Sequence, residues 1–421
     1  MDDLWAAQHE DIHTLDTFSE HGRSTRTGRL SERIVVSHLR DWLLEDYAAT
    51  YCRALAATRI FRRCYWIDAL GSDTRVKRVE QDEAQPTTKR NKGEVVPQLQ
   101  SLVTLAGTLA QEDKPLALRG LVLTGGSSKR HETRSHDNGS TSERTYTLPK
   151  ESGLLPASWL EIAPTLLAAI EQSPAIFLLN PLGATTFLYD DLTPLYQRAV
   201  PTELCLLIVH KQVGALLRAA HHSKERAATL TGLVRSDRWK VLPQEEEQLE
   251  QAVSGWLELF TGSMQRHFPF AVQRIAVQAQ TAPATITALP YTLLFATRRQ
   301  DSLMSMNDAV YHRQRRLQEQ SWRGLLSEAW FFEQDRVRRQ EQLQQLTQHM
   351  LQQGRAQRAR RWPDLRQQLI LQRFGRLPRQ DYDACMRQLL LDGEVRCAWQ
   401  QPLHDQPDER IPGNNDTLQW R

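Results

Sequence analysis

The hydrophobic positions of the chain follow two patterns, one typical of amphipathic helices and one typical of buried strands. Between residues 31 and 57, Leu39, Trp42, Leu43 and Tyr47 recur at the three- and four-residue spacing of one helix face, which predicts a long helix. Short, mostly apolar runs follow it, and such runs are typical of strands buried on both faces of a sheet. They predict strands over residues 64–70, 116–123, 175–179 and 204–209.

Helical patterns separate these strands, so the predicted order of elements is that of an α/β fold. Strands that alternate with helices imply a parallel sheet with crossover helices. Two further strands, 275–280 and 291–297, are joined by a Pro-containing connection and predict a hairpin that adds one antiparallel strand. The arrangement matches the doubly wound sheet of class I methyltransferases, although the pattern alone also fits other α/β folds. The helices are expected over residues 98–110, 159–170, 192–200, 211–221, 245–265 and 303–316.

The C-terminal third has a different pattern. Residues 319–361 are rich in Gln and Arg with spaced apolar positions, which predicts one or two long helices. Beyond Trp362, the order helix, turn, helix, Gly393 and strand is typical of a winged-helix module. The polar segments 72–97 and 127–145 are expected to form loops.

These patterns divide the chain into five predicted parts. They are an N-terminal arm (1–30), a methyltransferase-like Rossmann domain (31–318), a basic helical linker (319–361), a winged-helix-like domain (362–402) and a disordered tail (403–421).

The net charge of +3 conceals an uneven distribution of arginine. The 53 basic residues comprise 9 lysines and 44 arginines, and no lysine follows Lys240. Between Arg298 and Arg379 there are 17 arginines against 8 acidic residues. A strongly basic segment on a mildly acidic body indicates a polyanion, such as nucleic acid, as a partner. The alternative is that these Arg-rich helix surfaces form a protein interface or reflect a GC-rich genome.

Composition argues against several classes of protein. The five cysteines are scattered without a Cys-x-x-Cys pair, which argues against a disulfide framework and against a structural zinc site. No run of about 18 apolar residues occurs, and the first residues lack the basic-then-apolar order of a secretion signal. We therefore expect no metal, no membrane partner and a cytoplasmic location.

Four stretches of the chain carry a resemblance to a known family. They are SHLRDWLLEDY, CYWIDALGS, AIFLLNPLG and YTLLFATRRQDSLMSMNDAVY. In their order and spacing they resemble the three-Cys-motif partner family of bacterial proteins, over about residues 31–316, and the winged helix extends the likeness to about residue 400. The resemblance implies a methyltransferase-like Rossmann fold, a protein partner, and a setting in phage defence or a mobile element.

A methyltransferase of this fold holds S-adenosylmethionine at the ends of its first two strands, and this chain departs from that pattern. The first strand ends in Asp68, but Gly71 is the one glycine kept from the family's glycine-rich turn. Ala69 and Leu70 carry side chains that narrow a ligand's approach to the backbone. The second strand ends in Thr124, where a ribose-binding carboxylate is expected. Asp68, Gly71 and Thr124 are the candidate cofactor-binding residues, and ordinary strand-end turns are the alternative.

The third strand ends in the sequence NPLG, which resembles the Asn-Pro-Pro-Tyr motif of amino-group methyltransferases. Asn180 and Pro181 are therefore the candidate catalytic residues, because in that motif a carboxamide and a backbone carbonyl accept hydrogen bonds from the target amine. Leu182 stands where a stacking residue is expected, so the ring would have to come from Phe187 or Tyr189. A strand-end turn is again the alternative.

Arginines in and after the linker are the candidates for nucleic-acid binding, because they would neutralise phosphates. The predicted second helix of the winged module, 380–391, holds one arginine beside Asp381 and Asp383. We therefore expect phosphate contacts through the linker rather than reading of bases by this helix. The candidates are Arg355, Arg358, Arg360, Arg361, Arg376, Arg379 and Arg387.

Because all three cofactor elements are weakened, the first hypothesis is a methyltransferase-like protein with a degenerate S-adenosylmethionine site. Such a protein would serve as a nucleic-acid-binding or scaffold subunit of a bacterial multi-protein system. The second hypothesis is an active S-adenosylmethionine-dependent methyltransferase with a divergent pocket, acting on nucleic acid or on a partner protein. The third is a scaffold that binds only protein.

Overall fold

A computed structural model describes residues 32–70, 97–125, 152–183, 186–268, 271–282, 284–323, 327–358, 360–400 and 410–421. The chain divides into two compact units, Met1–His38 and Leu39–Arg421, and of the first unit residues 32–38 are described. The predicted arm and the two predicted loops lie outside the described residues, apart from residue 97, with which a helix begins.

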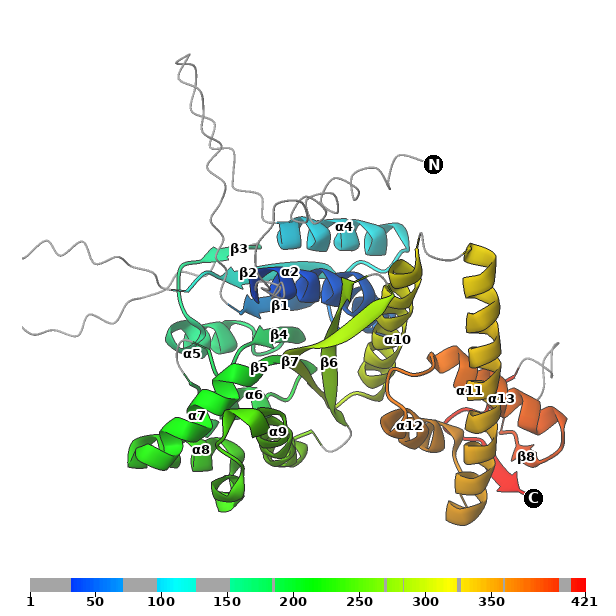
Figure 1. The fold of residues 1–421 in the computed structure, drawn as a ribbon. Helices are drawn as coiled ribbons and strands as arrows, with labels where there is room; N and C mark the ends of the chain where they lie inside the picture. Colours follow the sequence, from blue (N-terminus) through cyan, green and yellow to red (C-terminus); the bar gives the residue numbers. More distant parts are fainter. Residues whose placement is uncertain are drawn as a thin grey trace, which may run out of the picture. The chain divides into compact units, whose positions relative to one another are not determined.

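The second unit is built on a seven-stranded sheet. Its strands are β1 (Arg63–Ala69), β2 (Ala117–Leu123), β3 (Gly153–Leu155), β4 (Ala175–Leu179), β5 (Thr202–Val209), β6 (Ala271–Ala282) and β7 (Thr285–Thr297). They lie in the order β3-β2-β1-β4-β5-β7-β6 (Figure 1). β1 to β5 pair in parallel, whereas β7 is antiparallel to β5 and β6. The predicted parallel sheet with a terminal hairpin is confirmed, and the fold is compatible with a Rossmann-like one.

Helices flank this sheet on both faces. They are the Leu39–Trp42 stretch of α2 (Glu32–Trp42), which continues through a π-helical turn into α3 (Ala49–Thr58), then α4 (Pro97–Gln111), α5 (Trp159–Ala169), α6 (Tyr189–Gln197), α7 (His210–His222), α8 (Lys224–Val234), α9 (Leu249–Gln265) and α10 (Gln300–Trp322). Helices α5 through α9 share one hydrophobic core with alternate residues of the strands, such as Ile67, Phe177 and Leu206. The π-helical turn (Leu43–Ala48), α4 and α10 contact the other face. Because both faces are covered, every residue of β4 and β5 is buried, as their apolar sequences predict.

Several elements of this part differ from the sequence prediction, including β7, which begins at Thr285, six residues before its predicted start. β3 has only three residues, which is too short to give a recognisable periodicity. α8 is largely polar, and it begins after Ser223, whose side chain accepts a hydrogen bond from the Arg226 amide. α6 begins at Tyr189, three residues before its predicted start. Each of these elements depends on tertiary packing more than on its own pattern.

The C-terminal part has its own hydrophobic core. It contains α11 (Glu328–Gln357), α12 (Trp362–Gln372), α13 (Arg379–Leu391) and a two-stranded sheet of β8 (Val395–Ala398) and β9 (Thr417–Trp420). The predicted helix–turn–helix and short strand are observed. The predicted disordered tail 403–421 is wrong from Arg410 onward, because β9 pairs with β8 and buries Leu418; residues 403–409 lie outside the described residues.

Asn307 of α10 joins the turn between α12 and α13 to the sheet-bearing part. Its side chain is fully buried, accepts a hydrogen bond from the Gly375 amide at 2.8 Å and donates one to the Leu377 carbonyl at 2.9 Å. Gly375 has a φ of +73°, and a Cβ there would lie 2.4 Å from Val310 of α10. The neighbouring Asp308 accepts a hydrogen bond from the Arg379 amide at the start of α13. α10 therefore holds the helix–turn–helix through backbone groups as well as through packing.

Glu203, at the start of β5, is a fully buried carboxylate at the amino end of the parallel strands. It accepts hydrogen bonds from the hydroxyls of Tyr47 and Ser302, each at 3.1 Å, and Thr297 also hydrogen-bonds to it. Burial raises the pKa of Glu203 from its usual 4.5 to about 7, although these hydrogen bonds lower it in part.

We expect the buried Glu203 to make folding less favourable as pH rises. A carboxyl whose pKa is higher in the folded state stabilises that state most at low pH, and the contribution is lost between about pH 4.5 and 7. The free energy of unfolding should fall by about 3 kcal/mol over this range because of this group. Glu203→Gln should lack that decrease and be more stable than the wild type at pH 8. Urea unfolding of both proteins at pH 5 and pH 8 measures it, and equal pH dependence would contradict it.

Candidate functional site

The carboxyl ends of β1, β2 and β4 meet at one edge of the sheet, where open α/β sheets bind their ligands. The strand order changes direction between β1 and β4, since β2 and β3 continue on one side and β5 on the other. Ala69 is paired with Leu179, and Asp68 with Val122, so the strand ends Leu70, Thr124 and Asn180 follow at matching positions. The structure therefore brings the predicted residues Asp68, Thr124, Asn180 and Pro181 to the same edge. Gly71 lies outside the described residues.

The Asp68 carboxylate forms an ion pair within the protein. Its side chain is fully buried and faces Arg40 of α2, with Nη2–Oδ1 at 3.0 Å and Nε–Oδ2 at 2.5 Å. Oδ1 also accepts a hydrogen bond from the Leu70 amide at 3.2 Å, which closes a turn at the end of β1. Both carboxylate oxygens are therefore engaged by the protein, and a ligand would have to displace a buried guanidinium to reach them.

Thr124 and Asn180 are also engaged by neighbouring groups. The Thr124 hydroxyl donates to the Leu155 carbonyl of β3 at 3.4 Å. In Asn180, Oδ1 accepts a hydrogen bond from the Leu182 amide at 3.0 Å, and Nδ2 donates to Gln212 Oε1 at 3.3 Å. The Pro181 carbonyl accepts one from the Phe187 amide. These are the bonds of a strand-end turn, and they use the carboxamide that would have to accept a hydrogen bond from a target amine.

The two rings proposed to stack on a substrate base are packed elsewhere. Phe187 is buried in the core beneath the helices. The Tyr189 hydroxyl lies 2.5 Å from His267 Nε2, and the Arg235 guanidinium lies 4.5 Å from the Tyr189 ring centre. His267 is also stacked on Tyr196, and burial together with Arg298 and Arg235 lowers the pKa of His267. Tyr189 therefore belongs to an aromatic cluster of α6 and the end of α9.

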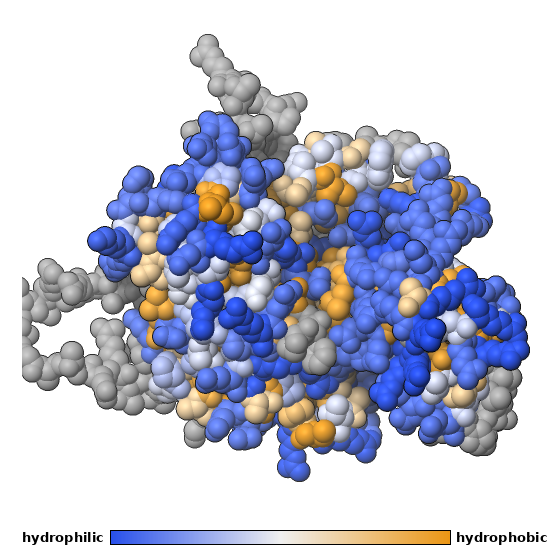
Figure 2. Space-filling model, turned by 90° about the horizontal axis from the view of Figure 1, so that it is seen from below, coloured by the Kyte–Doolittle hydropathy of each residue, from blue (hydrophilic) through white to orange (hydrophobic). Residues whose placement is uncertain are grey.

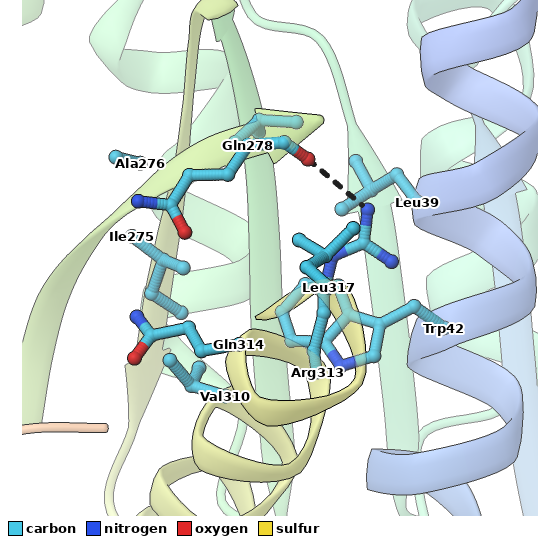
Figure 3. Close-up of a pocket in the computed structure, with 10 residues that line it drawn as sticks. Leu39, Trp42, Ile275, Ala276, Gln278, Val310, Arg313, Gln314 and Leu317 are labelled. Atoms are coloured by element: carbon cyan, nitrogen blue, oxygen red, sulfur yellow. Dashed lines mark hydrogen bonds between the residues drawn. The ribbon is translucent and has the colours of Figure 1, made fainter. Parts of the chain in front are cut away.

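A small cavity lies between α10, β6 and the Leu39–Trp42 stretch of α2. In it the Arg313 guanidinium lies over the Trp42 ring, 5.2 Å from its centre, and approaches the Gln278 carbonyl at 3.5 Å (Figure 3). The cavity has a volume of about 20 Å³, enough for one water molecule. It is lined by no residue of β1, β2 or β4, so it is separate from the strand ends.

The seven candidate arginines lie on several elements of the C-terminal part. Arg355 and Arg358 lie at the end of α11, Arg360 and Arg361 in the connection to α12, Arg376 in the next turn, and Arg379 and Arg387 in α13. Much of the surface at the right of Figure 2, where the C-terminal helices lie in Figure 1, is strongly hydrophilic.

Three of these arginines are already engaged or covered. Arg355 pairs with Glu394 and Arg379 with Asp383, while Arg387 is half-buried. Among the described residues, no carboxylate lies within ion-pair distance of the other four, whose side chains are exposed. These four are Arg358, Arg360, Arg361 and Arg376.

The described residues contain no group of three or more His, Cys, Asp or Glu side chains that could hold a metal ion. His210 bonds to Thr292 and His221 packs edge-on against Trp239. Within the same residues, no helix is both long enough and apolar enough to span a bilayer.

Two residues that engage the predicted site residues, Arg40 and Gln212, were not predicted from the sequence. Arg40 lies among the apolar positions of the first helix, and an arginine at such a position indicates a buried acidic partner. Gln212, which bonds to Asn180, lies in the first turn of α7 and has no recognisable signal in the sequence.

Comparison of the chain with protein-family models, with curated proteins and with solved structures finds no match.

We expect Arg40→Met to lower the free energy of unfolding by about 3–5 kcal/mol, because it leaves the buried Asp68 carboxylate without its cation. Arg53→Met is the matched control, since Arg53 forms a more exposed ion pair with Glu112, and its loss should cost at most about 1 kcal/mol. The double variant Arg40→Met/Asp68→Leu should recover part of the loss. Denaturant unfolding measures all three, and equal costs for the two single variants would contradict a stabilising ion pair.

Proposed function

We propose that this chain is a methyltransferase-like protein with a degenerate cofactor site, and that it binds nucleic acid as a subunit of a bacterial multi-protein system. The observation that carries the proposal is the buried Arg40–Asp68 ion pair at the point where the strand order reverses. It engages the carboxylate that the resemblance would assign to S-adenosylmethionine.

The strand order supports the methyltransferase-like part of the proposal. The order β3-β2-β1-β4-β5-β7-β6, with β7 alone antiparallel, is the order that class I methyltransferases have. The resemblance to the three-Cys-motif partner family, with its phage-defence or mobile-element setting and its protein partner, agrees with this interpretation.

The C-terminal part supports the nucleic-acid part of the proposal. Three helices, α11 to α13, followed by the β8–β9 hairpin have the element order of a winged-helix module. The exposed Arg358, Arg360 and Arg361 lie between the first two of these helices. Free guanidinium groups attract phosphates without reading sequence.

Calorimetric titration tests the degenerate site. S-Adenosylmethionine added to the full chain should give no binding heat, because a buried ion pair engages Asp68 and a turn uses Asn180. Micromolar binding that is lost in Asn180→Ala would contradict the proposal and favour an active methyltransferase with a divergent pocket.

Binding to a DNA duplex and to a single strand should weaken as salt rises, because phosphate neutralisation releases counterions. Replacing Arg358, Arg360 and Arg361 together by Ala should reduce the magnitude of the duplex slope of log K against log salt by about 2 to 3. Arg336→Ala is the control, since Arg336 is exposed on the same α11 but pairs with Glu333. An affinity that does not change with salt, or an unchanged slope in the triple variant, would exclude these arginines as the binding surface.

A further inference from the structure

A second cluster of arginines surrounds a cavity between α10, α11 and the turn that precedes α13. The cavity has a volume of about 200 Å³. Arg315 comes from α10, Arg338 and Arg339 from α11, and Arg376 from the turn, while Tyr311 and three glutamines complete most of the lining. Asp335 is the one acidic residue in the lining. Of these arginines, Arg376 alone is among the residues predicted from the sequence to bind nucleic acid.

Two carboxylates, Asp335 in the lining and the buried Asp381, hold three of the guanidinium groups in place. Asp381, which is buried, binds Arg339 through two bonds, Nη2–Oδ1 at 2.6 Å and Nε–Oδ2 at 3.3 Å. Asp335 binds Arg338 at 3.1 Å and lies 3.6 Å from Arg315. Guanidinium groups fixed in this way lose little conformational entropy when they bind a ligand.

The cluster keeps an excess of positive charge and of hydrogen-bond donors. Arg339 pairs with Asp381, Arg338 and Arg315 lie beside Asp335, and Arg315 also pairs with Glu319, so four arginines are set against three carboxylates. Each guanidinium has five N–H donors, and the carboxylates accept only a few of the twenty. Among the described residues, Arg376 is within ion-pair distance of no carboxylate, so the excess charge lies at the turn.

The three carboxylates offset most of this charge, and the remaining positive charge and unused N–H donors around Arg376 favour an anion in the cavity. Phosphate oxygens match the planar fork of arginine, which binds them through two parallel bonds. A volume of about 200 Å³ is larger than one phosphate group needs and smaller than a drug-sized ligand pocket.

We propose that this cavity is a binding site for phosphate groups, held by Arg315, Arg338, Arg339 and Arg376. The phosphates come either from a nucleic-acid backbone or from a free nucleotide, since the two sources share this chemistry. The first source deepens the proposed function and rests on it, because it adds a fixed phosphate contact beside the exposed arginines. The second source is independent of it.

Inorganic pyrophosphate titrated into the full chain by calorimetry tests the site directly. Arg376→Gln and Arg338→Gln should each weaken binding about 10-fold or more, because a charged hydrogen-bonding partner of the phosphate is lost. Arg336→Gln is the matched control, since it removes the same charge from the same helix outside the cavity, and it should leave binding unchanged. Arg339 is not substituted, because its loss would leave the buried Asp381 carboxylate without its cation. Thermal melting of each variant confirms folding.

Two competitors then identify the source of the phosphate. Displacement of pyrophosphate by a DNA oligonucleotide, together with weaker oligonucleotide binding by Arg376→Gln, assigns the site to a backbone. Displacement by a nucleoside triphosphate alone assigns it to a free nucleotide.

The site is refuted if the wild type binds no pyrophosphate, if both cavity variants bind it as tightly as the wild type, or if neither competitor displaces it. The proposed function survives that result when the oligonucleotide still binds and the Arg358/Arg360/Arg361 variant weakens it. Conversely, pyrophosphate binding without any oligonucleotide binding removes the proposed nucleic-acid function and leaves the phosphate site standing.

Discussion

Two buried carboxylates on one face of the sheet depend on a single helical segment, and much of the structure follows from their pairing. Asp68 on β1 and Glu203 on β5 both lie among apolar neighbours, where an unpaired charge or acceptor would cost several kcal/mol. Arg40 supplies the cation for one, and Tyr47, seven residues later, supplies a hydroxyl for the other. These two contacts therefore fix the position of the helical segment from Leu39 to Thr58 relative to β1 and β5. As a result, Arg40 engages the Asp68 carboxylate at the edge of the sheet where a ligand would bind.

The sequence was most informative where burial imposes a pattern. β4 and β5 are apolar on both faces and were predicted within two residues, because covered parallel strands admit few polar side chains. β9 was missed, since it is four residues long, follows a polar stretch and is held by pairing with β8 and by Trp420 packing on Gly354 of α11. Such an element is created by its partner and has little signal of its own.

The candidate site could be located from sequence but its chemical state could not. Strand ends identify the edge of a parallel sheet, so Asp68 and Asn180 were correctly expected together there. Whether their polar atoms are available depends on Arg40 and Gln212, which are 28 and 32 residues away in the chain. Periodicity shows which face a residue occupies, but it does not show which side chain meets it across a helix–sheet interface.

Net charge is a poor guide to partners in an arginine-rich chain, because internal acceptors use many of the guanidinium donors. In the sheet-bearing part, Arg198 and Arg298 donate hydrogen bonds to backbone carbonyls such as those of Ser173 and His267. Along α11, Arg336 and Arg338 pair with carboxylates one turn away. An external anion can bind only those guanidinium N–H groups that no internal acceptor uses. Within the described residues, these groups lie around Arg376 and in the stretch after Arg355. The fold thus engages the polar groups Asp68, Thr124 and Asn180 at the sheet edge in internal bonds, and it leaves free donors in the connections between the C-terminal helices.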